Sequence, residues 1–572
     1  MEDRHIIVAK KALRLTAAAA LAGMTLGAGA VHGATPRSAV KYSGVVTITD
    51  WQFPDGCGPG AASVANQEIC GAMNTLLFIP DQNLNYFPYL ATEIPTIKNG
   101  GAKIVNGNLV VTYKLRPNKW SDGTDETASD FIFGTHLNLA IGNSLGIDQI
   151  TAMKAVDSHT LQVTYKGTYA PYYTIGQPVS DPQHYFEKKY GSTDLKAIGA
   201  KYVNDTYGSP SDVFDGPYKI QSYTNGQSIV LTPNTGFAAF PSRASQPLPA
   251  QIKFVNITDN ETGLATALQS ASSGVDKAED FQATDLPVLN NASKYHITNQ
   301  PALTVEHLEL NQGGPLQDPK LRQALQYAVD KETLYHDLFP QVSDPKTFLL
   351  KSVLPNSSPW LNKSIGVSEY NPNKAKALLK AAGYATSYFG PGKHLYLTFA
   401  TTTAPVRQKD FQILSRFWAN VGIHVSPKFV SGSPSANGGM FSPYNLNGVL
   451  ATRHFDIALF AFTEPPDPQS EETSFLPNFI PTATVHSASQ QNYNGINDAD
   501  QAALLIKART ALDSSQRHAL FNQWQSLVNS RVYFIMLYAR SNITADNGHI
   551  GNFKPNPTSV GNDWNAYEWY AK

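Results

Sequence analysis

Residues 460–470, which read FAFTEPPDPQS, place two carboxylates on a stiff piece of backbone. Glu464 and Asp467 flank two prolines directly after an apolar run. Because proline fixes φ and lacks an N–H donor, the carboxylates are held in place. A fixed carboxylate beside Phe462 suits binding of a cationic group such as a free α-amine, where a charge-assisted hydrogen bond contributes about 1.5–3 kcal/mol. The same residue types also fit an exposed acidic loop.

A second acidic stretch, residues 111–134, has a structural explanation for each of its carboxylates. Its first half alternates apolar and polar residues, the period of a half-buried strand. Asp122 and Gly123 form a turn dipeptide. Thr127 and Asp130 offer side-chain oxygens that would cap a helix beginning at Phe131. We therefore expect these acids to shape the chain rather than to catalyse a reaction.

The motifs of several enzyme and metal classes are missing from the sequence. There is no phosphate-binding loop, no His-Glu-x-x-His and no Cys-x-x-Cys, and the 14 histidines are scattered without a ligand pair at helical spacing. We therefore expect a protein that is not an enzyme and that carries no cofactor or metal. A secreted hydrolase is the remote alternative, and it would need a nucleophile–base pair or a metal cluster.

The only two cysteines, Cys57 and Cys70, lie in the part of the chain that we expect to be exported. An oxidising compartment favours a disulfide between them, which would stabilise the fold by roughly 3 kcal/mol in the chain-entropy model. Two free thiols are the alternative. A metal site is a poor explanation, because the two sulfurs lack partner ligands nearby.

The size and charge of the chain limit its class. At 572 residues it is too long for one ordinary core, so we expect two or three domains. Its formal net charge of −1 argues against nucleic acid or an anionic membrane as a partner, because both require a basic field.

The N-terminus resembles a secretory signal peptide. Four basic residues precede an uncharged run rich in Ala, Leu and Gly, residues 15–31, and Ala28-Gly29-Ala30 or Ala34 offers a cleavage site. We predict that residues 1–30 are a cleaved signal peptide. A retained membrane anchor is the alternative, and a run this short and rich in Ala and Gly favours it less.

Strand and helix signals mix in the first half of the chain, and strands and helices alternate more regularly in the second. The strands expected in the first half are 45–49, 161–165, 216–223 and 228–233, and the loop after 45–49 is a place where α/β proteins put ligand contacts. From residue 304 onward, a strand–helix–strand unit at 395–430 predicts a largely parallel sheet. We expect one α/β domain at 306–542, with the tail rejoining the first half.

Short motifs along nearly the whole exported chain resemble the family 5 extracellular solute-binding proteins, the periplasmic oligopeptide- and dipeptide-binding proteins of ABC importers. The signature is a strand ending in Leu115-Arg116, a turn Trp120-Ser121-Asp122-Gly123 and a helix start Ala128-Ser129-Asp130. Further segments follow in the family's order: 155–173, 215–234, 318–334, 370–384, 417–425, the acidic Pro-rich loop and 498–538.

The resemblance implies an α/β, two-lobed, periplasmic-binding-protein-like (class II) clamshell with an extra subdomain in the first lobe. Carried onto this chain, it gives lobe I as 31–75 plus 206–305 plus 543–572, the extra subdomain as 76–205 and lobe II as 306–542. It implies an extracytoplasmic, monomeric substrate-binding component that captures short peptides and delivers them to membrane permease subunits. An oligosaccharide or another small solute, such as a metal chelate, is the alternative ligand.

The resemblance also implies the binding residues. The family's amine-binding Asp falls on Glu464, ahead of Pro466-Asp467-Pro468, and the backbone of Ala461, Phe462 and Thr463 would line an extended peptide. The loop Trp51-Gln52-Phe53 would face it. Arg407 lies near the family's carboxylate-binding Arg without aligning to it, so the far end of the ligand stays open. For an oligosaccharide, Trp51, Phe462 and Trp418 would supply stacking rings, although Trp418 lies on a core stripe.

Overall fold

The computed structural model describes residues 40–50, 52–58, 64–143, 146–237, 246–258, 260–270, 273–486, 489–558 and 560–572. The segment Val40–Lys572 forms one compact unit. The predicted signal peptide lies outside the described residues. Within those residues, every helix is too short or too polar to cross a bilayer.

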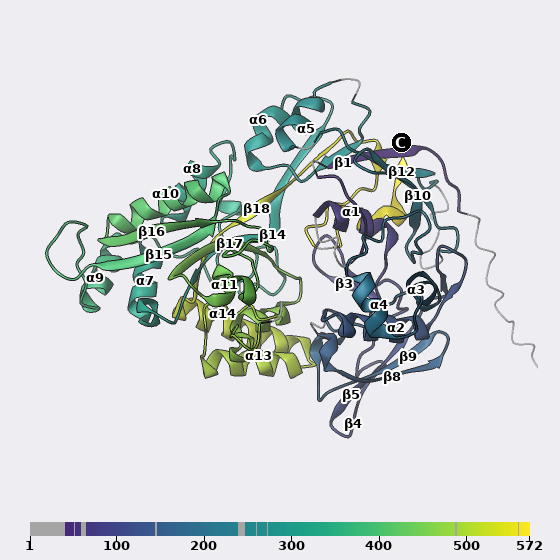
Figure 1. Ribbon diagram of the computed structural model, residues 1–572, viewed down its shortest axis with the longest axis horizontal. Helices are drawn as coiled ribbons and strands as arrows, with labels where there is room; N and C mark the ends of the chain where they lie inside the picture. The colour runs from purple at the N-terminus through teal and green to yellow at the C-terminus, as the bar shows by residue number, and fades with distance from the viewer. Residues whose placement is uncertain are drawn as a thin grey trace, which may run out of the picture. The chain divides into compact units, whose positions relative to one another are not determined.

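A ten-stranded mixed sheet forms the frame of this unit (Figure 1). Its first five strands in spatial order are β10 (Tyr218–Thr224), β11 (Ser228–Pro233), β12 (Gln251–Val255), β1 (Val45–Asp50) and β13 (Lys277–Glu279). The other five are β18 (Phe534–Asp546), β14 (His296–Leu310), β17 (Ile457–Thr463), β15 (Leu395–Thr402) and β16 (Ile423–Val430). We call the part built on β10–β13 and β1 the first lobe, and the part built on β17, β15 and β16 the second lobe.

The long strands β14 and β18 run from one lobe into the other (Figure 1). They pair antiparallel along their length, from His296 opposite Asp546 to Glu309 opposite Phe534. The first lobe's β13 pairs with the last residues of β18, whereas β17 pairs with the second half of β14. The domain limits expected at 305/306 and 542/543 fall inside these two strands.

The second lobe contains the predicted strand–helix–strand crossover. Strands β15 and β16 are parallel, and α10 (Pro405–Ala419) connects them. The crossover buries Leu414 and Trp418 in the core of the lobe, and the indole N–H of Trp418 donates to the carbonyl of Leu325. The other helices of this lobe are α7 (Pro319–Tyr327), α8 (Lys331–Leu338), α9 (Pro372–Ala381), α11 (Val449–Thr452), α12 (Glu472–Phe475), α13 (Ala499–Thr510) and α14 (Ser514–Arg531).

Side-chain caps fix where these helices begin. Asp318 accepts a hydrogen bond from the N–H of Lys320 at α7, and Asn371 accepts one from the N–H of Lys374 at α9. Each cap satisfies an N–H that has no partner inside the helix, which is why these residue types mark helix starts in the sequence.

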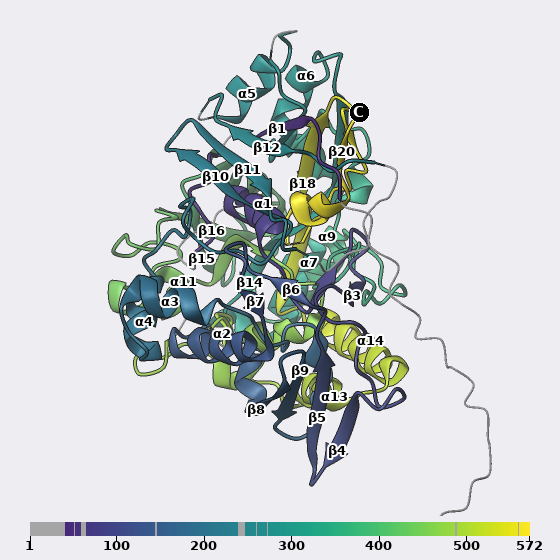
Figure 2. The same ribbon diagram turned by 90° about the vertical axis from the view of Figure 1, so that its right-hand side faces the viewer.

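A smaller sheet and α2 (Ala128–Ala140) form a separate layer (Figure 2). The sheet has the order β4 (Ala102–Val105), β5 (Asn108–Lys114), β9 (Thr160–Tyr165) and β8 (Ile150–Asp157). Helix α2 begins three residues before the expected Phe131, because Thr127 is its N-cap and Asp130 accepts the N–H of Thr127 at 2.8 Å. Asp122 accepts the N–H of Thr124 in the predicted turn. The acids of this stretch therefore have structural partners.

The C-terminal tail packs on the first lobe. Trp569 lies in the same apolar cluster as Val46 and Ile69, and Lys277 of β13 pairs with Asp563 at 2.7 Å. The remaining helices and strands are α1 (Val64–Met73), β2 (Phe78–Pro80), β3 (Tyr86–Pro88), β6 (Asn118–Lys119), β7 (Asp125–Glu126), α3 (Gln183–Tyr190), α4 (Leu195–Tyr202), α5 (Glu261–Ala267), α6 (Leu286–Leu289), β19 (Ile550–Gly551) and β20 (Tyr570–Ala571).

Candidate functional site

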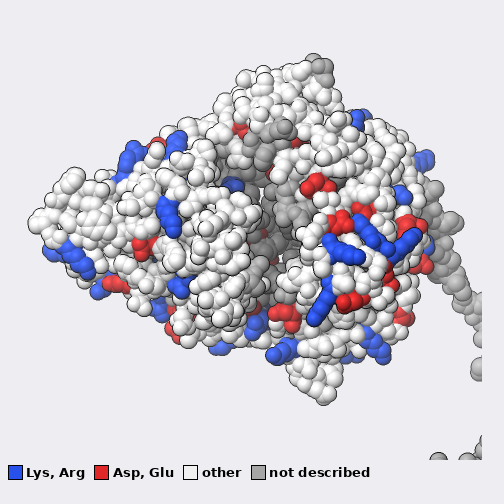
Figure 3. Space-filling view, in the orientation of Figure 1, with Lys and Arg blue, Asp and Glu red and all other residues white. Residues whose placement is uncertain are grey.

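A cleft of about 500 Å³ lies between the two lobes. Its walls come from α1 and the loop after β13 on the first lobe, from β14, β18 and the end of β17, and from the C-terminal tail at residues 556–558. Figure 3 shows the molecule hollowed between the lobes, where few charged side chains reach the surface in view. The volume is in the range of cavities that bind small molecules.

Glu464 lies at the edge of this cleft, immediately after β17. Its backbone N–H donates to the carbonyl of Leu303 at 3.0 Å, which holds the residue against β14. Beside it, the hydroxyls of Thr463 and Thr304 lie 2.9 Å apart across the two strands. Only 8% of Glu464 is exposed, so its carboxylate is largely removed from water.

A second carboxyl group, that of Glu471, is hydrogen-bonded to Glu464. Burial raises the pKa of Glu464, and burial together with the charge of Glu464 raises the pKa of Glu471 well above its ordinary value. Two buried carboxyls this close do not both ionise readily, so the pair favours a state with one proton and one negative charge. A cation that enters the cleft meets this charge in a region of low dielectric.

The strand before Glu464 is partly open on one side. In the described ladders, β15 pairs only with Ile457 and Ala458 of β17, and the backbone from Ala461 to Thr463 extends beyond that pairing. Thr463 lines the cleft. Phe462 instead stacks on His307 at 5.1 Å and lines a small adjoining cavity with Glu464 and Glu471.

The structure does not bring Asp467 into the cleft. Its carboxylate is 1% exposed and accepts hydrogen bonds from both terminal nitrogens of Arg517, at 3.1 and 2.7 Å. It also accepts the N–H of Gln469 and the hydroxyl of Thr174, a residue that precedes it by 293 positions. Asp467 therefore joins α14 to the layer that carries α2 and has no free edge for a ligand.

Arg407 lies in a side cavity of about 180 Å³ that adjoins the cleft. It is 7% exposed and donates to Thr402 and to Glu306 at 3.2 Å each. The same oxygen of Glu306 also accepts from Nε of Arg540 at 2.9 Å. Arg540 lines both the cleft and the side cavity, so it is the arginine nearer to the cleft. Nothing in the local sequence around Arg540 signals this position.

The described part of the loop after β1 does not line the cleft, although the resemblance implies that this loop faces the ligand. Trp51 lies outside the described residues. Gln52 is exposed and its N–H donates to Asp50, while Phe53 stacks on Tyr223 at a ring separation of 6.4 Å. In the described part of this loop, no residue lines the cleft.

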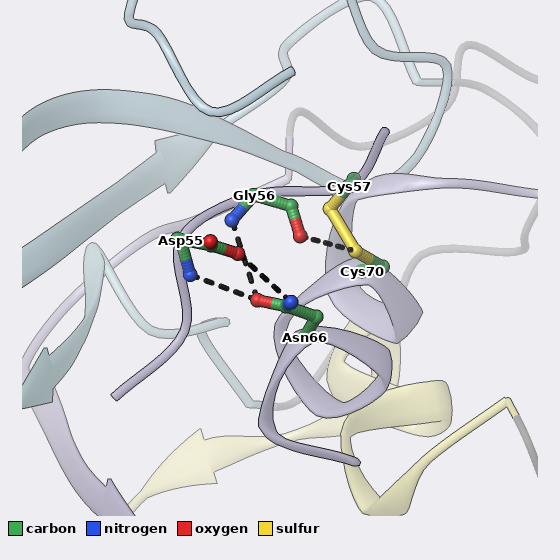
Figure 4. The surroundings of a disulfide bond; sticks show 5 residues. All are labelled: Asp55, Gly56, Cys57, Asn66 and Cys70. Carbon is green, nitrogen blue, oxygen red and sulfur yellow. Dashed lines mark hydrogen bonds between the residues drawn. A yellow bond between two sulfur atoms is a disulfide. The ribbon is translucent and has the colours of Figure 1, made fainter. Parts of the chain in front are cut away.

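A disulfide between Cys57 and Cys70 ties this loop to α1 (Figure 4). Asn66 of the same helix accepts the N–H groups of Asp55 and Gly56 at 2.8 and 3.3 Å. These bonds fix the helix that places Gln67 and Glu68 on the wall of the cleft.

A buried acidic cluster next to the cleft has its own cation. Carboxylate oxygens of Glu68, Glu279 and Asp563 lie within 4.8 Å of one another, a spacing that a metal ion could bridge. The ammonium of Lys277 lies 2.9 Å from Glu279 and 2.7 Å from Asp563. This ammonium supplies the positive charge, so the cluster is explained without a metal.

A Gly-x-Ser-x-Gly motif occurs once, directly after α2. Residues 142–146 read GNSLG, the spacing of a hydrolase nucleophile elbow, but they follow the end of helix α2 and not a strand. A nucleophile elbow requires a strand before its serine and a helix after it. Ser144 itself lies outside the described residues.

Comparison with known proteins agrees with this architecture. Residues 85–476, more than half of the chain, match the family described as bacterial extracellular solute-binding proteins, family 5. A probable deoxycholate-binding periplasmic protein of Escherichia coli K12 is 21% identical over 79% of this chain and 81% of its own length. The periplasmic oligopeptide-binding protein OppA of the same organism is 23% identical over 71% of this chain and 74% of its own length.

The solved structures show the same fold. The oligopeptide-binding protein AppA of Bacillus subtilis, in complex with a nonapeptide, superimposes with a TM-score of 0.68 at 18% identity. The match covers 93% of this chain and 100% of that protein. The chain therefore has the two-lobed α/β fold of these proteins and belongs to the family 5 bacterial extracellular solute-binding proteins.

Proposed function

We propose that this protein is the extracytoplasmic binding component of an ABC importer that captures a short peptide between its two lobes. It delivers the peptide to permease subunits in the membrane, acts as a monomer after removal of residues 1–30, and binds its ligand without transforming it. The names of similar proteins support this proposal, since they include a periplasmic oligopeptide-binding protein.

The observation that carries the proposal is the buried carboxylate of Glu464 at the cleft edge. It provides a negative charge for the ligand's amine where water competes little, and Glu471 keeps the pair at one negative charge. The backbone of Ala461–Thr463, beyond the pairing with β15, would hydrogen-bond an extended peptide as a neighbouring strand does.

Closure of the lobes around β14 and β18 would couple binding to recognition by the permease. A ligand that touches both lobes stabilises the closed form by its differential affinity for that form. A ligand in the cleft would contact α1 on the first lobe and Glu464 on the second, so it would bridge the two lobes.

Isothermal titration calorimetry tests the role of Glu464. Glu464→Gln should weaken binding of free-amine peptides by roughly tenfold to a hundredfold, the effect of one charge-assisted hydrogen bond, and should change binding of N-acetylated peptides little. Glu332→Gln, at an exposed glutamate, is the matched control. Equal losses for both peptide types would remove the amine-binding role.

A different small solute is the second candidate ligand, because one similar protein is named for deoxycholate binding. The oligosaccharide alternative loses one of its three stacking rings, since Trp418 is fully buried. Thermal-shift screening of peptides, oligosaccharides and bile acids separates these ligand classes, because a bound ligand raises the unfolding temperature by mass action.

A further inference from the structure

Two histidines meet at one end of the second lobe, at the starts of two neighbouring strands. His394 directly precedes β15 and His424 is the second residue of β16, and Nδ1 of His394 lies 3.3 Å from Nε2 of His424. The two strands are parallel, and β16 is the edge strand of the ten-stranded sheet (Figure 1). The crossover through α10 places 30 positions between the two residues, so their spacing along the chain gives no sign of the pair.

The proton of the His394 ring has a fixed position. Its Nε2 lies 2.8 Å from the backbone carbonyl oxygen of Gly390, and a carbonyl oxygen can only accept, so Nε2 carries the proton. In a neutral imidazole the other nitrogen then holds a lone pair. The lone pair on Nδ1 therefore faces His424. A backbone carbonyl that accepts from the far nitrogen is a usual outer-shell partner of a metal-binding histidine.

The His424 ring is also held in one orientation. The ring centre of Tyr388 lies 3.8 Å from that of His424 and the ring centre of Tyr396 lies 4.6 Å from it, and each tyrosine ring is inclined to the imidazole by 30°. Tyr396 is opposite His424 in the register of β15 and β16, so its position follows from the strand pairing. Stacking on two rings fixes the plane of the imidazole, and with it the direction of Nε2, before any ligand binds.

The segment that carries Tyr388 and Gly390 packs closely on the start of β16. Gly422 has a φ of +94°, and a Cβ atom there would lie 2.7 Å from the backbone nitrogen of Ser387. Glycine adopts this φ without strain and has no Cβ to clash with the segment. The arrangement around the two histidines therefore depends on a close backbone contact and is not a chance meeting of surface side chains.

The distance between the two nitrogens fits a zinc ion. Histidine nitrogens bind zinc at about 2.0–2.1 Å, and zinc prefers a tetrahedral arrangement, so two such nitrogens are about 3.3–3.4 Å apart. The observed 3.3 Å matches this value, whereas N–H···O hydrogen bonds are mostly about 2.7–3.2 Å long. Ligands at right angles around copper or nickel would be closer, at about 2.9 Å.

The pair is open to water on one side. Both histidines are half-buried, and Tyr396 beside them has 66% of its surface exposed. Water can therefore fill the remaining corners of a zinc tetrahedron, as it does in zinc sites that keep an open position. Imidazole is among the ligands that zinc prefers. Neither histidine is among the residues that line the cleft.

From these observations we infer that His394 and His424 form a zinc site at the N-terminal ends of β15 and β16, with water in the remaining positions. The site lies apart from the cleft and does not depend on the proposed function. A bound zinc would join the segment before β15 to the edge strand β16 and would stabilise this end of the second lobe. The alternative is a hydrogen bond from Nε2 of His424 to Nδ1 of His394, which requires no metal.

Isothermal titration calorimetry with zinc chloride on the untagged protein tests the site. We expect one zinc ion per chain. His394→Gln, whose amide can still donate to Gly390, and His424→Phe, which keeps a ring beside the two tyrosines, should each weaken zinc binding tenfold or more. Loss of an outer-shell partner alone costs about 10–100-fold in metal affinity, so loss of a ligand should cost at least as much. His336→Gln, at a histidine 67% exposed on α8, is the control and should bind zinc as the wild type does.

Thermal unfolding gives a second measurement. Zinc should raise the unfolding temperature of the wild type and of His336→Gln by mass action, and it should raise that of the two site variants much less. The unfolding temperature in EDTA shows whether each variant is folded, so a loss of zinc binding is distinguished from a loss of structure.

The inference is wrong if the wild type binds no zinc, or if both site variants bind zinc as tightly as the wild type. It is also wrong if Glu68→Gln loses zinc binding while the site variants keep it, because the ion would then lie in the acidic cluster of Glu68, Glu279 and Asp563. Peptide affinity should be equal in the site variants and the wild type, so the proposed function is tested separately.

Discussion

Replacement of Asp467 tests whether the second carboxylate of the Pro-rich loop at residues 464–468 binds ligand or stabilises the fold. The structure gives Asp467 a buried, two-point ion pair with Arg517, whose side chain is 4% exposed. Asp467→Asn keeps the shape of the side chain and removes its charge. The guanidinium of Arg517 is then left buried without a counter-charge.

The expected cost follows from that geometry. Breaking a buried pair by removing one partner destabilises proteins by about 3–5 kcal/mol, because the remaining charge is uncompensated. The additional bonds from Gln469 and Thr174 would also weaken, which favours the upper half of that range. Urea unfolding followed by tryptophan fluorescence measures the change in unfolding free energy.

Two further variants make the test specific. Arg517→Met in the Asp467→Asn background should recover part of the loss, because it removes the unpaired charge. Glu369→Gln removes a partner from the solvent-exposed pair with Lys374 and should change the unfolding free energy far less than Asp467→Asn does. If Asp467→Asn unfolds within about 1 kcal/mol of the wild type but loses ligand affinity, the structural role assigned here is refuted.

Two other substitutions should have pH-dependent effects. Burial lowers the pKa of Lys331 from 10.5 to about 7. The charged ammonium therefore destabilises the fold fully below pH 7 and progressively less up to about pH 10.5. In urea titrations, Lys331→Met should raise the unfolding free energy by up to about 5 kcal/mol near pH 6, and this gain should vanish near pH 10. An equal gain at both pH values would contradict this account. The pKa of Glu471 is raised in the fold, so the protonated carboxyl costs no stability below about pH 4.5, and the fold loses stability relative to the unfolded chain as the pH rises above that value. Glu471→Gln cannot ionise, so it should match the wild type near pH 4 and melt at a higher temperature near pH 8. A variant that melts lower than the wild type near pH 8 would argue against a shared proton.

Local patterns determined much of the fold. The period of two in β9 and β11, the Asp-Pro and Asn-Pro starts of α7 and α9, and the apolar stripe of α10 all depend on neighbours a few residues away. For that reason they can be recognised in the sequence. The start of α2 shows the limit of this approach, since two cap candidates three residues apart, Thr127 and Asp130, both form bonds and only the geometry shows which is the N-cap.

The site was predictable in part for the same reason. Glu464 follows an apolar strand and precedes two prolines, and the structure places it at the cleft edge. Asp467 has nearly the same neighbours in the sequence, but its side chain is buried outside the cleft. Its partners are Arg517, 50 residues later, and Thr174, 293 residues earlier, and no local pattern reports such distant contacts.

By itself, then, the sequence determined several strands, the strand–helix–strand crossover of the second lobe and a carboxylate suited to a cation. The tertiary structure alone decided which charges share the cleft. Arg407 and Arg540 both contact Glu306, yet only Arg540 also reaches the wall between the lobes. That outcome depends on how β14 lies between β17 and β18, because cross-strand neighbours are set by the pairing of distant segments and not by adjacency along the chain.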